Sequence, residues 1–194
     1  MNSKHTVFIA SKHPVVRLGL QWCIASETCF DVVGEASDGL EAYSKIVLLE
    51  PEIVILDIVM PEIDTVELVH RLSLLGKPPK VILIADEEKS IDLDLVFESK
   101  VNGFFYKGIR SADFLFALNK VIENDYVYSK ALFSGLGNEN GVGMGIVFIT
   151  DSQKDVIVRR LKHEDVNENE CDEDSPLLDI MNSINVLNHG VLSK

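Results

Sequence analysis

Short apolar runs alternate with amphipathic segments along the first two-thirds of the chain. Most of the runs contain β-branched residues, which is typical of strands buried on both faces of a parallel sheet. They lie at residues 6–10, 30–35, 53–57, 80–85 and 103–106. The segments with helical spacing lie at residues 14–26, 38–49, 64–74, 91–100 and 111–124. This alternation predicts an α/β domain, in which right-handed crossovers place helices on both faces of a parallel sheet.

Local start signals support several of these helices. Pro14 suits the first turn of a helix, because its ring fixes the backbone in a helical φ. Asp38-Gly-Leu-Glu41 has the spacing of a capping box, in which two side chains satisfy free backbone amides. Ser111 is expected to cap the fifth helix.

The pattern changes after Asp125. Residues 134–145 are rich in Gly and Asn, which is typical of a flexible linker. Two short helices are expected beyond it, one from Thr150 and one from Ser175-Pro176, with the acidic run 164–174 between them. We therefore predict a domain over residues 1–125, a linker over 126–148 and a small helical C-terminal region over 149–194.

Charge and composition exclude some function classes. The net charge of −13 opposes broad binding to nucleic acid or to anionic membranes, both of which need clustered Lys and Arg. No stretch is long and apolar enough to cross a membrane, and residues 1–5 carry no signal-peptide pattern. We expect a cytoplasmic protein with no membrane partner. Neither the cysteines nor the histidines have metal-ligand spacing.

The most informative segment is residues 51–61, an apolar run that ends in Asp57 and continues with Ile-Val-Met-Pro61. A lone carboxylate at the carboxyl end of a buried strand lies where α/β folds bind ligands. Ser11 and Lys12 stand at the end of the first strand, and Ala85 stands at the end of the fourth.

Four motifs in order resemble the response-regulator receiver domain, in particular that of NarL/LuxR-type regulators. The resemblance covers roughly residues 6–124. The motifs are His13-Pro-Val-Val-Arg-Leu-Gly-Leu20, Gly34-Glu-Ala-Ser-Asp-Gly-Leu-Glu41, Asp57-Ile-Val-Met-Pro61 with Asp64, and Gly103-Phe-Phe-Tyr-Lys107. The resemblance implies a flavodoxin-like fold, a five-stranded parallel sheet of order 2-1-3-4-5.

The family chemistry implied by this resemblance is phosphorylation of the strand-three Asp with the help of Mg²⁺. Asp57 matches the phosphoacceptor and Lys107 matches the lysine that contacts phosphate oxygens. Ser11 and Lys12 replace the acidic pair that would hold the metal, and Ala85 replaces the usual Thr or Ser.

Two further positions bear on the resemblance. Thr65 replaces the glycine usual after Asp64, and Phe104 occupies the aromatic position that turns inward or outward with the phosphorylation state in the family.

The loss of two carboxylates and the gain of an ammonium change the local charge by about three units, which opposes Mg²⁺ binding. We therefore expect no metal and no other cofactor. One hypothesis is that Lys12 substitutes for the metal and forms a fixed ion pair with Asp57. The alternative is that Lys12 points to solvent. Either arrangement makes normal phosphotransfer improbable.

These features predict an atypical two-component response regulator, a pseudo-receiver that controls transcription through protein–protein contacts rather than as an enzyme. The resemblance implies a protein partner or a homodimer through the face formed by helix 4, strand 5 and helix 5. The alternative is a NarL/LuxR-type DNA-binding transcription factor, conventionally or weakly phosphorylated at Asp57. The C-terminal region resembles a degenerate helix-turn-helix domain, but residues 175–193 contain no Lys or Arg for phosphate contacts.

Overall fold

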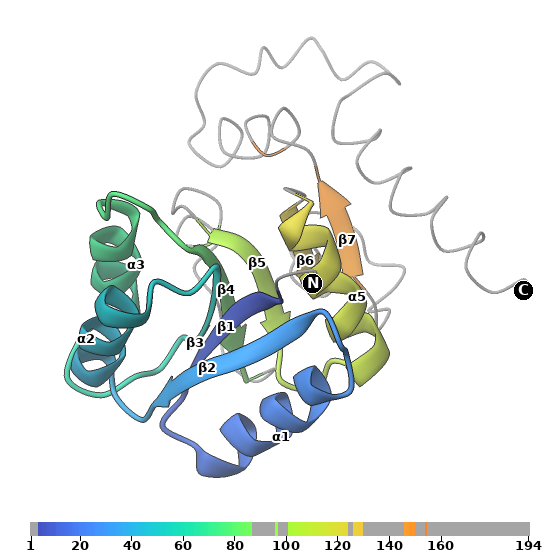
Figure 1. The fold of residues 1–194 in the computed structure, drawn as a ribbon, viewed down its shortest axis with the longest axis horizontal. Helices are drawn as coiled ribbons and strands as arrows, with labels where there is room; N and C mark the ends of the chain where they lie inside the picture. The colour runs from blue at the N-terminus through green and yellow to red at the C-terminus, as the bar shows by residue number, and fades with distance from the viewer. Residues whose placement is uncertain are drawn as a thin grey trace, which may run out of the picture.

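The sheet is flanked by helices on both faces (Figure 1). The structure, a computed structural model, describes residues 4–86, 96, 101–123, 126–129, 146–149 and 154. The strands are β1 (His5–Ala10), β2 (Phe30–Ala36), β3 (Ile53–Asp57), β4 (Lys80–Ala85), β5 (Val101–Tyr106), β6 (Tyr126–Ser129) and β7 (Ile146–Ile149). The helices are α1 (Pro14–Ala25), α2 (Gly39–Leu49), α3 (Thr65–Ser73) and α5 (Ser111–Ile122).

The strand order confirms the flavodoxin-like fold. The sheet runs β2-β1-β3-β4-β5-β6-β7, so its first five strands have the predicted order. All five are parallel, and the register pairs Asp57 at the end of β3 with Ile84 of β4. This topology brings the carboxyl ends of β1, β3, β4 and β5 to one edge of the sheet.

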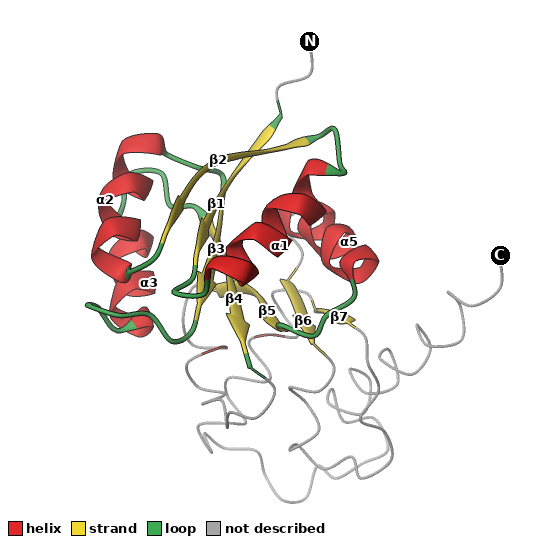
Figure 2. Cartoon of the chain, turned by 90° about the horizontal axis from the view of Figure 1, so that it is seen from below, coloured by secondary structure: helices red, strands yellow, loops and turns green. Residues whose placement is uncertain are grey.

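Two hydrophobic clusters cover the two faces of the sheet. On one face α2 and α3 contribute Ala42, Ile46 and Leu68 among others, and Phe104 of β5 belongs to the same cluster. On the opposite face, α1 and α5 contribute Ile24 and Phe114. Figure 2 shows the two helix pairs on opposite sides of the strands. The strands are therefore buried on both faces, as their continuous apolar runs predicted.

The helix starts agree with the sequence except at α5. Asp38 accepts a hydrogen bond from the Glu41 amide at 2.8 Å, as the predicted capping box requires. The α5 prediction was wrong by one residue, because Arg110 is the N-cap residue and makes no side-chain capping bond. Ser111 is instead the first residue of α5, and its hydroxyl oxygen accepts from Cys23 Sγ at 3.5 Å.

The sheet extends beyond the five strands expected from the sequence. β6 pairs in parallel with β5, and β7 pairs antiparallel to β6. Except for Ile149, both strands lie within the range that the sequence assigned to a linker. Val127 and Tyr128 of β6 are fully buried. Phe148 of β7 packs edge-to-face on Phe116 of α5, with ring centroids 5.4 Å apart. β5 is consequently an interior strand.

Other predicted segments lie largely or wholly outside the described residues. These are the helix at 91–100, apart from the buried helical residue Val96, the Gly-rich stretch 134–145, and the C-terminal helices apart from the helical residue Lys154. In the part of the chain that the structure describes, none of the helices combines the length and apolar character needed to cross a bilayer.

Candidate functional site

Four neighbouring strands bring polar side chains together at the carboxyl edge of the sheet. Asp57 is the last residue of β3, and Ser11 directly follows β1. Asp86 directly follows β4, and Lys107 directly follows β5. Because β3 lies between β1 and β4 in the sheet, Asp57 occupies the centre of this group.

The Asp57 carboxylate is fully buried, and both of its oxygens have partners. Oδ2 accepts a hydrogen bond from Ser11 Oγ at 2.7 Å and lies 2.9 Å from Lys107 Nζ. Oδ1 accepts from the amide of Val59 at 3.3 Å. A buried carboxylate needs such partners, because its transfer from water without them is very costly. Asp57 is thus held in place by a hydroxyl, an ammonium and a backbone amide.

Lys107 bridges two carboxylates. Besides Asp57, its Nζ lies 3.2 Å from Asp86 Oδ1, and the Lys107 side chain is only 15% exposed. Sequence reasoning missed Asp86, although its position directly after a buried strand is the same signal that identified Asp57. The Lys107 ammonium therefore pairs with two carboxylates, the buried one of Asp57 and the exposed one of Asp86.

Lys12 does not form the hypothesised ion pair with Asp57. Within the described residues the cation beside Asp57 is Lys107, and Lys12 is exposed. Ser11 is fully buried, so the side chain that reaches Asp57 from the end of β1 is its neutral hydroxyl. The ion-pair hypothesis was wrong because the inward position at this strand end belongs to Ser11. The exposed Lys12 agrees with the alternative, in which its ammonium keeps its hydration at the surface.

Two further predicted site residues, Ala85 and Phe104, are both fully buried. Ala85 is fully buried and, as an alanine, offers no hydroxyl at the end of β4. Phe104 is fully buried and packs edge-to-face on Tyr106, with ring centroids 5.2 Å apart. Its register partner on β6 is Tyr128, so Phe104 lies inward beside a strand that the sequence did not predict.

Thr65 anchors the backbone of the loop between β3 and α3. Its Oγ1 lies 3.2 Å from the carbonyl oxygen of Asp57 and 3.1 Å from that of Ile58, and the residue is only 3% exposed. A glycine at this position could not donate to either carbonyl. Thr65 therefore fixes the backbone that carries Asp57 rather than contacting its carboxylate.

The same loop packs closely on the start of α2. The carbonyl of Pro61 accepts from the amides of Gly39 at 3.1 Å and Ile63 at 2.9 Å. The bond to Ile63 closes a γ-turn around Glu62, whose φ of 71° is unusual for a residue with a side chain. A Cβ added at Gly39 would lie 1.9 Å from Ile63 Cγ2, so only glycine fits there. The loop beside Asp57 is thereby fixed at two points.

The donor set at this edge does not fit Mg²⁺. The cation requires several oxygen ligands, preferably carboxylates, that are free to approach it. Asp57 Oδ2 is already shared by a hydroxyl and an ammonium, and Asp86 shares the same ammonium. Among the described residues, no three His, Cys, Asp or Glu side chains are grouped so that they could hold a metal ion.

Comparisons with known proteins identify the family. The family model described as the response regulator receiver domain matches residues 7–119. The nitrate/nitrite response regulator protein NarL of Escherichia coli K12 is 25% identical over 127 residues, which cover 66% of this chain and 59% of NarL. The response regulator protein VraR of Staphylococcus saprophyticus is 24% identical over 132 residues, 68% of this chain and 63% of VraR. The chain thus spans less than two-thirds of the length of these relatives.

Solved structures show the same fold. The isolated receiver domain of RcsB from Salmonella enterica serovar Typhimurium superposes with a TM-score of 0.62 at 20% sequence identity, covering 67% of this chain and 96% of that domain. The receiver domain of the NarL regulator from Mycobacterium tuberculosis gives a TM-score of 0.58 at 24% identity, covering 62% of this chain and 98% of that domain.

Proposed function

Because this chain belongs to the response regulator receiver family and has relatives of the NarL/LuxR type, we propose that it is an atypical two-component response regulator. In this proposal its receiver domain is a pseudo-receiver that functions without phosphorylation of Asp57. It controls transcription through contacts with other protein molecules.

The observation that carries the proposal is the closed environment of Asp57. Attack on a phosphoryl group requires a carboxylate oxygen that can approach phosphorus in line, and a cation that offsets the repulsion between the two anions. Here the Oδ2 atom is engaged by Ser11 and Lys107, and the acidic pair that would bring a metal is replaced. Ser11 and Lys107 together give Asp57 the role of a structural anchor.

The position of β6 modifies the expected contact surface. The family resemblance implies contacts through helix 4, strand 5 and helix 5, but the edge of β5 is paired with β6 in this chain. Contacts on that face would therefore be made by α5 and β7 and not by β5. The proposed output remains protein–protein contact, through a surface that does not require the β5 edge.

Acyl-phosphate labelling tests the proposal directly. The full chain is incubated with acetyl phosphate, with and without Mg²⁺, and the intact mass is measured at intervals. We expect no phosphorylated species above the background seen with the Asp57→Asn variant. Stoichiometric, Mg²⁺-dependent labelling of Asp57 would overturn the proposal and would indicate conventional phosphorylation.

The second candidate is a DNA-binding transcription factor of the NarL/LuxR type. It is favoured by similarity to a solved structure, a DNA-binding response regulator of the LuxR family from Staphylococcus aureus. The net charge of −13 opposes it. A gel-shift series across salt concentrations separates the two candidates, since binding through phosphate contacts weakens steeply as salt rises.

A further inference from the structure

The outer edge of β2 is open to another extended segment. Among the described strands, β2 stands at one end of the sheet, so one side of its backbone has no strand partner. Figure 1 shows it at the border of the sheet, beside α1. An edge strand presents backbone amides and carbonyls that can pair with a further strand. The β2 edge is therefore a possible site of strand addition.

A groove of about 460 Å³ follows this edge. It is lined by the continuous stretch 30–35 of β2 and, from α1, by Ile24 and Ala25. Ile24 and Phe30 are buried and Val32 is partly buried, so the inner part of the groove is apolar. The volume falls within the range of sites that receive ligand groups in proteins. The edge thus offers backbone pairing, and the groove beside it has room for a side chain.

The groove ends at Glu35, where both the backbone and the side chain already have partners. Lys45 Nζ donates to the Glu35 carbonyl at 2.9 Å. Gln21 Nε2 donates to Glu35 Oε2 at 2.6 Å, and Arg17 Nε lies 3.3 Å from the same oxygen. The part of the edge that can pair with an added strand is therefore the stretch of β2 before Glu35.

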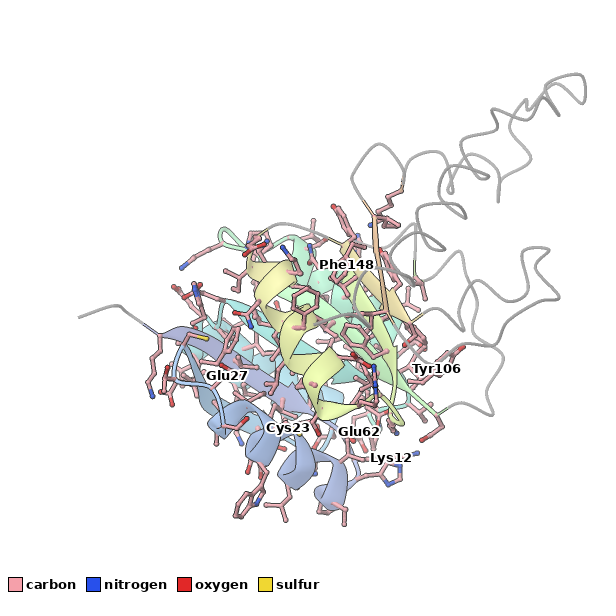
Figure 3. The ribbon with its side chains drawn as sticks, turned by 90° about the vertical axis from the view of Figure 1, so that its right-hand side faces the viewer. Lys12, Cys23, Glu27, Glu62, Tyr106 and Phe148 are labelled. Atoms are coloured by element: carbon pink, nitrogen blue, oxygen red, sulfur yellow. The ribbon has the colours of Figure 1, made fainter. Side chains whose placement is uncertain are left out.

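The groove is bordered by acidic side chains. Its lining includes Glu27, Asp31 and Glu35, and Lys4 is the one basic residue in the part of the lining that the structure describes. Glu27 follows α1, and Figure 3 shows its side chain at the opposite end of that helix from Lys12. Asp31 is exposed, and within the described residues neither Asp31 nor Glu27 has an ion-pair partner. These charges favour a basic occupant.

The same charges oppose a second copy of the chain as the occupant. Two β2 strands paired antiparallel about a two-fold axis at Val33 would place Asp31 of each copy opposite Glu35 of the other. Like charges directly opposite each other in a sheet are destabilising. The net charge of −13 adds to this repulsion. A strand that carries Lys or Arg would instead meet opposite charges along the groove.

We propose that the β2 edge and its groove form a docking site for an extended, basic segment of a partner protein, which adds to the sheet as a strand beside β2. An apolar side chain of the segment enters the groove near Ile24 and Val32, and Lys or Arg residues beside it pair with Glu27 and Asp31. The inference rests on the proposed output by protein–protein contact and gives the chemistry of the partner. One added strand buries little surface, so we expect a dissociation constant on the order of tens of micromolar.

A synthetic peptide that alternates lysine and valine over seven residues, with lysine at both ends, probes the site. Its fluorescein-labelled form is titrated with the full chain while the fluorescence anisotropy is recorded. A control peptide of the same sequence has N-methylated backbone amides, so it keeps every side chain but cannot donate hydrogen bonds to β2. We expect the control to bind at least about tenfold more weakly, because main-chain hydrogen bonds supply much of the affinity in strand addition.

Hydrogen exchange locates the bound peptide on the chain. Amide exchange of the full chain is followed by mass spectrometry with and without a saturating amount of the lysine–valine peptide. We expect exchange to slow in residues 30–35 of β2, whose outer amides gain partners, and to remain unchanged in α3 on the opposite face of the sheet.

Matched variants test the charges. Glu27→Lys and Asp31→Lys should each weaken binding of the lysine–valine peptide several-fold, and the double variant should weaken it at least about tenfold. The control is Glu67→Lys on α3, which makes the same change of charge away from the groove and breaks only an exposed ion pair with Arg71. A peptide with glutamate in place of lysine should bind the double variant and not the parent chain.

Several results would overturn the proposal. The first is no binding of the lysine–valine peptide at concentrations well above the micromolar range. Equal binding of the N-methylated peptide, or equal weakening by Glu67→Lys and Asp31→Lys, would reduce the contact to general attraction between opposite charges. A self-associated chain that the peptide dissociates would make a second copy the occupant. None of these measurements involves Asp57, so a failure here is distinguishable from a failure of the acyl-phosphate test of the proposed function.

Discussion

Lys107 Nζ lies 2.9 Å from Asp57 Oδ2, and this lysine supplies the positive charge that the buried carboxylate requires. By their positions in the sequence, Lys12 and Lys107 could each have supplied this charge. Lys12 is exposed, whereas Lys107 has only 15% of its side chain exposed and also reaches Asp86. Lys107, which matches the family lysine by resemblance, is thus already paired with two carboxylates.

Replacing Lys107 with methionine should destabilise the fold strongly. The substitution leaves Asp57 buried without its cation, which typically costs about 3–5 kcal/mol. Urea denaturation followed by circular dichroism measures the change. In the double variant with Asp57→Asn the uncompensated charge is absent, so most of the lost free energy of unfolding should return. Equal losses in the single and double variants would mean that the ion pair matters little.

Restoring the family pattern should restore metal binding. In the triple variant Ser11→Asp, Lys12→Asp, Ala85→Thr, two carboxylates join Asp57 at the edge of the sheet, and the hydroxyl at the end of β4 returns. We expect Mg²⁺ to raise the melting temperature of this variant and to permit labelling of Asp57 by acetyl phosphate. The parent chain should show neither effect. A triple variant that folds but does not respond to Mg²⁺ would contradict this explanation.

The Thr65 hydroxyl should contribute measurably to stability. Thr65→Val keeps the shape but removes the hydroxyl from the buried carbonyl of Asp57 and the partly buried carbonyl of Ile58, so we expect a loss of about 1–2 kcal/mol in the free energy of unfolding. Thr65→Ser keeps the hydroxyl and is the matched control. If the two variants lose the same amount, packing of the threonine methyl is the important contact.

Glu41 should make stability depend on acid pH. A hydrogen bond from Lys45 and another from the Ser37 amide lower the pKa of Glu41 from 4.5 to about 2. A pKa lowered on folding stabilises the fold above the unfolded value, and this contribution disappears as the pH falls from about 4.5 toward 2. Glu41→Gln should therefore be less stable than the parent at neutral pH, and the difference should vanish at low pH. The effect should be modest because solvent screens this half-exposed pair.

The sequence predicted the first five strands because each is an apolar run bounded by turn residues and preceded or followed by a helix. It did not predict β6, since Tyr126–Ser129 is only four residues long and lies before a glycine-rich stretch that dominates the local pattern. Val127 is buried in the cluster that includes α5, and Tyr128 is buried beside Phe104 on the opposite face of the sheet; both are tertiary effects that no local signal carries.

At the site, the sequence identified the strand ends but not the direction of each side chain. Ser11 and Lys12 are adjacent, and which of them turns inward depends on how β1 enters the loop before α1. The hydroxyl of Ser11 reaches Asp57, so the neutral residue and not the charged one completes the site. Asp86 was not predicted because the family resemblance marks Ala85, the residue before it, and not Asp86 itself.

The pairing of β6 with β5 sets where the chain can be shortened. A fragment that ends at residue 125 would leave the backbone amides and carbonyls along one side of β5 unpaired and would uncover the ring of Phe104 beside the missing Tyr128. Such an open, flat strand invites aggregation. We expect the smallest soluble fragment to extend through Ile149, so that the two additional strands are retained.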